Sequence, residues 1–229
     1  MNDDINRMDE GLVDFYSGKK VLITAGPTVE PIDDVRYISN YSSGKMGYAL
    51  AEKVAELGAD VTLVSGPVHI PVPDNVHIIN VRSAEEMYQA ANDVFPECDI
   101  AIMTAAVADF TPAEKYSGKI KKENVEGEMT LRLVRTKDIL AELSKIKSKE
   151  QKVIGFALES ENEIENGLRK LRKKKCDMIV VNSANKPDSG FGGDMNTITI
   201  ITSSGEQKAF APMPKTLCAV EILKMAASI

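Results

Sequence analysis

The sequence of 229 residues has no tryptophan and little cysteine or histidine. Its cysteines, Cys98, Cys176 and Cys218, are widely spaced and form no CxxC pair, which favours reduced thiols over disulfides and predicts no redox role. His69 and His77 have no neighbouring cysteine or HxxxH partner, so a structural zinc site is not expected.

Long apolar runs are also missing. No stretch approaches the ~18 consecutive apolar residues that span a membrane, and the start MNDDINRMDEGLVDF has neither the basic residues nor the apolar run of a signal peptide. The net charge of −6 argues against a nucleic-acid binder, because such proteins neutralise phosphates with a basic face. We therefore expect a cytoplasmic protein with small-molecule partners, and neither a membrane nor a nucleic-acid partner.

The residues that are present have a globular balance, with 43% hydrophobic and 27% charged, and the chain is long enough to bury a core. Residues 1–18 show no clear period and end in Tyr-Ser-Gly, so we expect a leader or linker there. Residues 19–229 are expected to form a single domain.

Beyond residue 19, short apolar runs alternate with segments of helical period. Val21–Thr24 predicts a buried strand, Gly44–Leu57 a helix stopped by Gly58, and Val61–Val64 a second strand, which is a βαβ unit. The later predicted elements are strands at His77–Val81, Asp99–Met103, Met129–Val134, Val153–Phe156, Met178–Val181 and Thr197–Ile201, and helices at Ala84–Val94, Ile139–Ile146, Glu161–Lys175 and from Lys215.

This order predicts an α/β fold with a Rossmann-like, doubly wound, mainly parallel sheet and helices on both faces. Ligands of such folds bind at the carboxyl ends of the strands. The loops that follow strands are therefore the candidates for a site.

The first such loop separates Thr24 from Gly44 by about nineteen residues, where about two to six are usual. It matches neither GxGxxG nor the P-loop pattern. Ser42, Ser43 and Gly44 begin the next helix, where free N–H groups attract a phosphate or carboxylate. An ordinary serine cap followed by a glycine for close packing is the structural alternative. The length of the loop favours binding.

The loop Thr104–Phe110 has three alanines that allow a ligand to approach the backbone closely. In the same loop, Asp109 supplies one carboxylate for a ribose hydroxyl, a metal-bound water or a structural cap. The sequence leaves both the functional and the structural interpretation of this loop open.

Two basic segments also allow two interpretations. Lys119–Lys122 is either a solvated turn or a flap that closes over phosphates. Lys170 and Lys174 share one helix face, and they either complement the helix dipole or converge on a triphosphate. In the polar loop Asn182–Asn196, Phe191 either fills the core or stacks on a ligand.

Six motifs in order, AGPTxEPIDxVRxISNxSSGKMG, VSGP, AAVADF, KIKK, GFALE and GFGGDMN, resemble the phosphopantothenoylcysteine synthetase family of bacterial coenzyme A synthesis, over Lys20–Ile229. The resemblance implies that CTP activates 4′-phosphopantothenate as an acyl-cytidylate, that pyrophosphate leaves, and that cysteine then attacks. It implies Mg²⁺ with CTP and no flavin in this chain. It also implies a homodimer that uses a small strand and flap insertion, and a decarboxylase partner that is fused or separate.

The resemblance also assigns residues. Asn40 matches the asparagine that holds the acyl-cytidylate, Lys119 the flap lysine that stabilises developing charge, and Arg36 the arginine beside the phosphopantothenate site. The implied substrate contacts further include Ser42, Ser43, Gly44, Ala105 and Ala106. The implied nucleotide contacts, besides Lys119, are Thr104, Ala105, Ala106, Asp109, Lys137, Asp138, Ile139, Leu140, Phe156, Lys170 and Lys174. Asp109 is the one candidate metal ligand, and Phe191, Asp194 and Asn196 belong to the family's terminal signature.

Two stretches depart from the family pattern. TKDIL stands where many relatives have NPDI, so Lys137 replaces a proline, and ALES replaces the commoner AAET beneath Phe156.

The alternative functions to a synthetase are an NAD(P)-dependent reductase and a catalytically silent nucleotide-binding protein. A reductase is expected to carry GxGxxG and an acidic residue at the end of the second strand, and the sequence has neither. A silent protein is expected to lack Asn40 or Lys119, and both are present.

Overall fold

The computed structural model describes residues 10–121, 123, 127–184 and 192–229. Its centre is an eight-stranded sheet with the order β13-β12-β10-β9-β6-β1-β4-β5. The six strands from β10 to β5 pair in parallel, and β12 and β13 are antiparallel. Their bounds are β1 Lys20–Ala25, β4 Asp60–Ser65, β5 Val76–Asn80, β6 Ile100–Met103, β9 Lys152–Glu159, β10 Met178–Ser183, β12 Ile198–Thr202 and β13 Gln207–Ala209.

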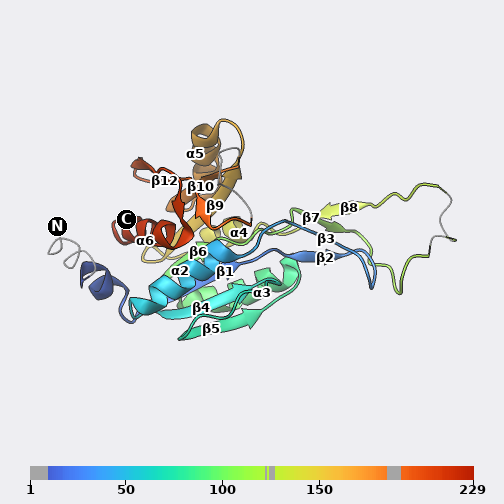
Figure 1. The fold of residues 1–229 in the computed structure, drawn as a ribbon, viewed down its shortest axis with the longest axis horizontal. Helices are drawn as coiled ribbons and strands as arrows, with labels where there is room; N and C mark the ends of the chain where they lie inside the picture. The colour runs from blue at the N-terminus through green and yellow to red at the C-terminus, as the bar shows by residue number, and fades with distance from the viewer. Residues whose placement is uncertain (1–9, 122, 124–126, 185–191) are drawn as a thin grey trace.

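The central strands of the sheet are buried on both faces, which explains why β1, β6 and β10 are continuous apolar runs. On one face, Val21 and Ile23 pack with α2 (Lys45–Glu56) and α6 (Lys215–Ala227). On the other, Leu22 packs with α3 (Ala84–Val94), α4 (Ile139–Ile146) and α5 (Glu163–Lys174). Figure 1 shows these helices around the sheet, and the predicted Rossmann-like fold with helices on both faces is confirmed.

The helices begin where the sequence carries caps. Ser83 Oγ accepts a hydrogen bond from Glu86 N at the start of α3 (3.2 Å), and Asp138 Oδ1 accepts one from Ala141 N at the start of α4 (3.1 Å). The helix predicted at Glu161–Lys175 is slightly shorter, and the strand predicted at Met129–Val134 is reduced to β8, Leu133–Arg135.

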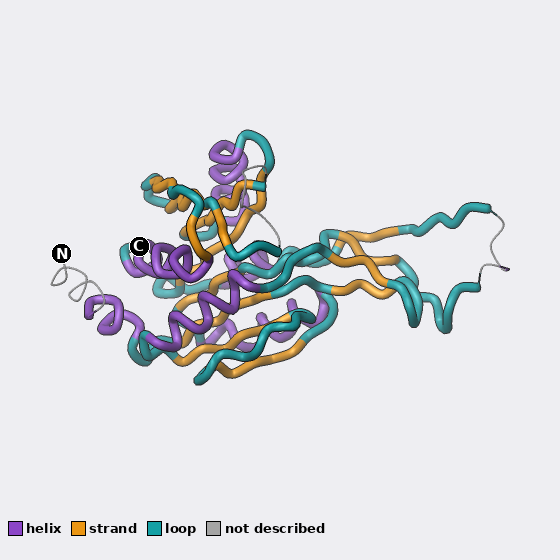
Figure 2. The backbone as a smooth tube through the Cα atoms, in the orientation of Figure 1, coloured by secondary structure: helices purple, strands orange, loops and turns teal. Residues whose placement is uncertain are grey.

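Several short elements have no counterpart among the predicted residue ranges, although the family resemblance implied a small strand and flap insertion. Two two-stranded ribbons, β2 with β3 and β7 with β8, extend together from the body as a projecting arm (Figures 1 and 2). A third ribbon, β11 with β14, lies before α6. The bounds are β2 Val29–Pro31, β3 Tyr37–Ser39, β7 Phe110–Pro112, β11 Met195–Asn196, β14 Met213–Pro214, and the 3₁₀ turn η1 Phe95–Glu97.

The described residues before Lys19 are part of the fold. Residues 10–16 are helical, Leu12 and Tyr16 are buried in the core, and Tyr16 Oη donates to Leu223 O (2.8 Å). These residues belong to the predicted leader or linker 1–18, and they carry too few apolar side chains to show a period, yet Leu12 and Tyr16 pack on a hydrophobic surface. Residues 1–9 lie outside the described part, and the division into a leader and one domain stays a prediction.

None of the helices in the described part of the chain combines the length and the apolarity that a membrane crossing requires.

Candidate functional site

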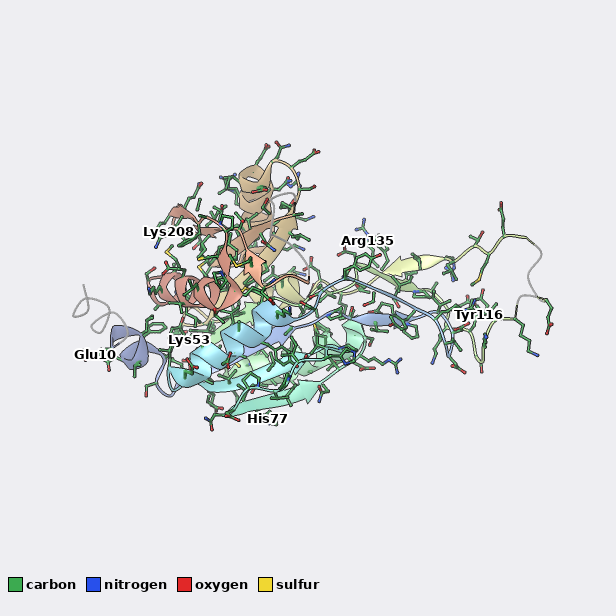
Figure 3. The ribbon with its side chains drawn as sticks, in the orientation of Figure 1. Glu10, Lys53, His77, Tyr116, Arg135 and Lys208 are labelled. Atoms are coloured by element: carbon green, nitrogen blue, oxygen red, sulfur yellow. The ribbon has the colours of Figure 1, made fainter. Side chains whose placement is uncertain are left out.

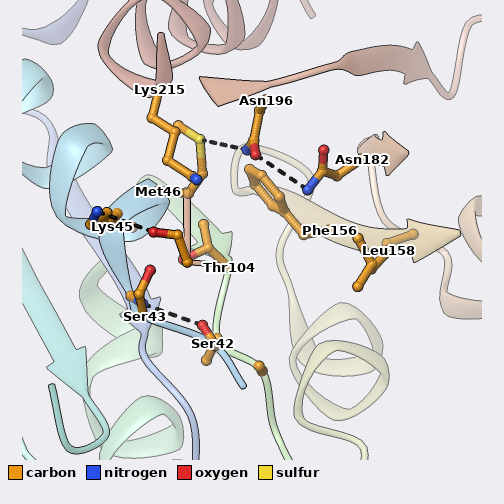
Figure 4. A pocket seen from close by; sticks show the side chains of 16 residues that line it. Ser42, Ser43, Lys45, Met46, Thr104, Phe156, Leu158, Asn182, Asn196 and Lys215 are labelled. Atoms are coloured by element: carbon orange, nitrogen blue, oxygen red, sulfur yellow. Dashed lines mark hydrogen bonds between the residues drawn. The ribbon is translucent and has the colours of Figure 1, made fainter. Parts of the chain in front are cut away.

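A pocket of about 160 Å³ opens at the carboxyl ends of the central strands (Figure 4). Its walls are residues 42–47 at the start of α2, residues 104–106 after β6, and residues 156–158 of β9. Asn182, Gly192, Asn196 and Lys215 complete it. The pocket therefore lies where doubly wound sheets bind ligands, and it brings together three predicted groups of site residues.

The start of α2 lacks a side-chain cap. Gly44 is the N-cap residue with φ 80°, and the first turn contains no acidic residue. Ser42 Oγ accepts from Gly44 N (3.3 Å), which precedes the helix, so an ordinary serine cap is not what the structure has. The first N–H groups of α2 thus remain available to an anion in the pocket.

Two glycines allow this close approach. A Cβ on Gly44 would lie 2.7 Å from Val68 Cγ1, and one on Gly47 would lie 2.5 Å from Thr104 Oγ1 and 2.6 Å from Ala25 Cβ. Close packing is what the structural alternative expected of Gly44, and Gly47, which the sequence analysis did not single out, is packed closely as well. The same packing sets the first turn of α2 against the Thr104–Ala106 loop.

Asn40 follows β3 and reaches the same loop. Its Nδ2 donates to Ala106 O (2.9 Å), and the Ala106 carbonyl also accepts from Thr28 N (3.3 Å). Pro27 and Ala106 form a parallel bridge. The long loop after β1 and the loop after β6 are therefore fastened together, with the Asn40 amide beside two predicted substrate contacts, Ala105 and Ala106.

Two pocket lysines were not predicted as site residues. Lys45 Nζ contacts Asp194 Oδ1 (2.6 Å) and Gly192 O (3.1 Å). Lys215 is only 8% exposed, and its Nζ donates to the carbonyls of Gly193 and Met195. Burial, and after it the charge of Lys45, lower the pKa of Lys215.

Lys45 and Lys215 give one wall of the pocket two cations. The GKMG stretch was a signal for Lys45, whereas Lys215 was interpreted only as a helix start. Asn196, from the terminal signature, is 2% exposed and lies beside Asn182 in the pocket (Figure 4). In the part of the chain that is described, the Lys215 ammonium has no carboxylate within salt-bridge distance.

The α5 lysines come together with several other predicted nucleotide contacts. Lys170 Nζ lies 2.7 Å from Glu159 Oε1, and Lys174 Nζ forms an ion pair with Asp138. Burial lowers the pKa of Lys174, and the nearby charge of Asp109 partly opposes this shift. Asp109, Asp138 and Lys174 are thus neighbours at the start of α4. A triphosphate bound here would have to replace Glu159 and Asp138 as the partners of the two lysine ammonium groups.

The side chains of three predicted nucleotide-binding residues point away from the pocket. Lys137 Nζ pairs with Glu85 (2.8 Å) and lies over the Tyr88 ring (4.2 Å). Ile139 is buried in the core, and Leu140 packs over Gly155. None of these three side chains lines the pocket.

Arg36 and Lys119 lie on the arm and do not line the pocket. The Arg36 guanidinium binds Asp33 and Ile120 O, while Lys119 is exposed. One chain therefore does not bring Lys119 to the pocket wall. Lys122 and Phe191 lie outside the described residues.

The expected metal ligand can be tested against the donor set. Among the described residues, no group of three or more His, Cys, Asp or Glu side chains could hold a metal ion. The charge of Asp109 acts to raise the pKa of Lys174, so this carboxylate lies near the end of α5. Such a donor set fits a divalent cation that is held mainly by a ligand's phosphates.

The fold and the pocket define a Rossmann-like α/β protein with a lysine-lined pocket at the carboxyl edge of its sheet. The chain belongs to the family described as DNA/pantothenate metabolism flavoprotein C-terminal domain, which it matches over residues 16–229.

Two curated relatives extend beyond the matched region. The chain is 51% identical, over 91% of its length and 58% of the relative's, to a protein called cysteine/cysteine sulfinic acid decarboxylase from an unknown prokaryotic organism. It is 48% identical, over 90% of its length and 51% of the relative's, to the coenzyme A biosynthesis bifunctional protein CoaBC of Vibrio vulnificus strain CMCP6. The chain thus spans little more than half the length of these relatives.

Among solved structures, the chain resembles the C-terminal domain of the coenzyme A biosynthesis bifunctional protein CoaBC. The TM-score is 0.80 at 39% identity, and the match covers 93% of this chain and 96% of that one. The likeness therefore extends over the whole of the fold described above.

Proposed function

We propose that this chain is a CTP-dependent ligase that joins 4′-phosphopantothenate to cysteine in coenzyme A biosynthesis. Support comes from the family and from the likeness to the C-terminal domain of CoaBC. Within the molecule, one pocket carries the proposal: the Thr104–Ala106 loop and the uncapped start of α2 line it, and the Asn40 amide is hydrogen-bonded to Ala106 of that loop.

In the first step, the substrate carboxylate attacks the α-phosphorus of CTP, an acyl-cytidylate forms, and pyrophosphate leaves. The reaction gathers negative charge, so fixed donors and cations lower its barrier. Lys170 and Lys174 exchange their carboxylate partners for phosphates, and the α2 N–H groups with Lys215 hold an anionic group in the pocket. Mg²⁺, when bound with CTP, supplies further neutralisation, and Asp109 would help to hold it.

In the second step, the cysteine amine attacks the acyl carbon and CMP leaves. The mixed anhydride is already activated, so no side-chain nucleophile is required. The Asn40 amide lies beside Ala106, where it can hold the acyl group. Lys119 acts earlier and stabilises the charge that develops in the first step. We propose no flavin for this chain.

We also propose a homodimer in which the arm contacts a second copy. Apolar side chains are exposed along the arm, with Val35 at 58%, Tyr37 at 57% and Val134 at 42%. Tyr116 and Arg135 mark the length of the arm in Figure 3. Burying such a surface against a partner removes it from water, and it would explain why Lys119 stands away from the pocket of its own chain.

A cytoplasmic location and a decarboxylase partner, fused or separate, complete the proposal. The fused CoaBC relative, of which this chain spans 51%, supports such a partner.

The experiment that separates this proposal from a reductase is a pair of binding titrations. The end of β4 carries Ser65, whose Oγ bonds Gly66 O and Tyr48 Oη, and no carboxylate for a ribose. We expect CTP with Mg²⁺ to bind and NADPH not to bind in matched calorimetric titrations. Saturable NADPH binding without CTP binding would contradict the proposal.

A further inference from the structure

The segment that carries Lys119 is fastened to the turn between β2 and β3 through alternating residues. Tyr116 N donates to Ile32 O (3.0 Å), Gly118 N to Asp34 Oδ2 (3.0 Å), and Ile120 N to Asp33 Oδ2 (3.0 Å). The last two of these bonds bracket Lys119. The backbone position of this lysine is thus set from both sides by two adjacent carboxylates.

Asp33 is the more constrained of the two. Its side chain is fully buried, whereas that of Asp34 is 55% exposed. Asp33 Oδ1 accepts from Val35 N (2.8 Å) and Arg36 N (2.7 Å), and Oδ2 accepts from the Arg36 guanidinium and from Ile120 N. The Arg36 guanidinium, together with these N–H groups, holds the pKa of Asp33 well below its usual range.

Arg36 completes the connection from the other side. Its Nε and Nη2 bind Asp33, and Nη2 also donates to Ile120 O (2.9 Å). Ile120 is therefore held at both its N–H and its carbonyl, by one ion pair. Removing Arg36 from this pair would leave a buried carboxylate without its cation, which is costly.

We propose that Asp33 is a positioning residue for the ligase reaction: its buried carboxylate anchors Ile120 and thereby fixes Lys119 for catalysis. This inference rests on the proposed function. It holds whether Lys119 serves the pocket of its own chain or that of a second copy, because the anchor lies within one chain.

Asp33→Asn tests the anchor directly. If the amide oxygen keeps the bonds to Val35 N and Arg36 N, the new NH₂ group faces the Ile120 N–H and the guanidinium, which are also donors. We expect the Ile120 amide to exchange with solvent at least about ten times faster, measured by NMR. Asp60→Asn, at the exposed start of β4, is the matched control and should leave the exchange rate unchanged.

The second measurement is a double-mutant cycle with Lys119→Gln on the rate of pyrophosphate release. We expect Asp33→Asn alone to lower kcat about tenfold or more with little change in the KM for CTP. In the Lys119→Gln background it should lower kcat no more than about twofold. If Asp33→Asn caused only a general structural defect, it would lower kcat by the same factor in the wild-type and the Lys119→Gln backgrounds.

Two results would overturn the proposal: unchanged Ile120 exchange in Asp33→Asn, or full multiplication of the two kinetic effects. If Asp33→Asn does not fold, Ile120→Pro removes the donor while it leaves the buried ion pair in place, and it should show the same coupling to Lys119. Absence of pyrophosphate release by the wild-type protein would contradict the proposed function, whereas the exchange measurement would still decide whether the anchor exists.

Discussion

At the scale of single residues, Asn40 is the side chain whose substitution best separates the two proposed reaction steps. Its Nδ2 donates to Ala106 O (2.9 Å), which holds the amide at the loop after β6. A carboxylate in this position could not donate that bond, and it would repel the anionic intermediate's phosphate.

We predict that Asn40→Asp still consumes CTP but stalls with acyl-cytidylate bound. The first step needs the cations at the triphosphate, whereas the second needs the acyl group to be held for the incoming amine. Rapid acid quench followed by mass detection should show the intermediate accumulating to a level comparable with the enzyme concentration. Finding no intermediate while CTP is consumed would refute this role.

Lys215 allows a second prediction at this scale. Charge-assisted hydrogen bonds contribute about 1.5–3 kcal/mol, so Lys215→Met should raise the KM of at least one anionic substrate roughly tenfold or more. Initial-rate kinetics with CTP and phosphopantothenate varied in turn will identify that substrate. Lys208→Met, which removes an exposed partner of Glu221 away from the pocket, is the control. Unchanged KM values for both substrates would remove Lys215 from the binding site.

At the scale of elements, the close packing of α2 decides the shape of the pocket. Gly47→Ala would drive a Cβ against Thr104 and Ala25, which are themselves packed. We predict a loss of about 1–3 kcal/mol in the free energy of unfolding, the usual cost of overpacking, measured by urea denaturation. Gly11→Ala has nothing within 4 Å and lies in the helical residues 10–16, so it should be neutral or stabilising. Equal effects of the two substitutions would contradict this account of α2.

The elements also show what a sequence can and cannot predict. The buried strands β1, β6 and β10 are continuous apolar runs, and the segments between them show a helical period, so the sheet and its helices were predictable. The arm strands β2, β3, β7 and β8 are only three residues long, which is too short to show an alternation of apolar and polar residues. Of the predicted site residues, the Thr104–Ala106 loop and Ser42–Gly44 do line one pocket.

The roles of Lys215 and Asp33 were not predicted because they depend on contacts with residues that are distant in the sequence. Lys215 binds carbonyls about 20 residues earlier, and Asp33 binds Ile120 across 87 positions. Lys137, which the family resemblance assigns as a nucleotide contact, pairs with Glu85 and lies over Tyr88 in the structure, so its contact with a nucleotide stays a prediction. A single sequence contains no signal for such long-range pairs.

At the scale of the whole molecule, the exposed apolar arm predicts self-association. Tyr37→Glu would put a charge on the proposed contact surface, so we expect the dimer dissociation constant to rise at least about tenfold in sedimentation velocity. Leu217→Glu, on α6 and 53% exposed, is the matched control and should leave the dimer intact. A wild-type protein that stays monomeric at micromolar concentration would contradict the dimer.

The central claim is that this pocket couples a phosphorylated carboxylic acid to CTP. The most direct measurement is pyrophosphate release by the purified, folded protein with Mg²⁺, with CTP and 4′-phosphopantothenate each omitted in turn. We predict release only when both are present, with cysteine required for continued turnover. Release that is independent of phosphopantothenate, or no release at all, would contradict the proposed function.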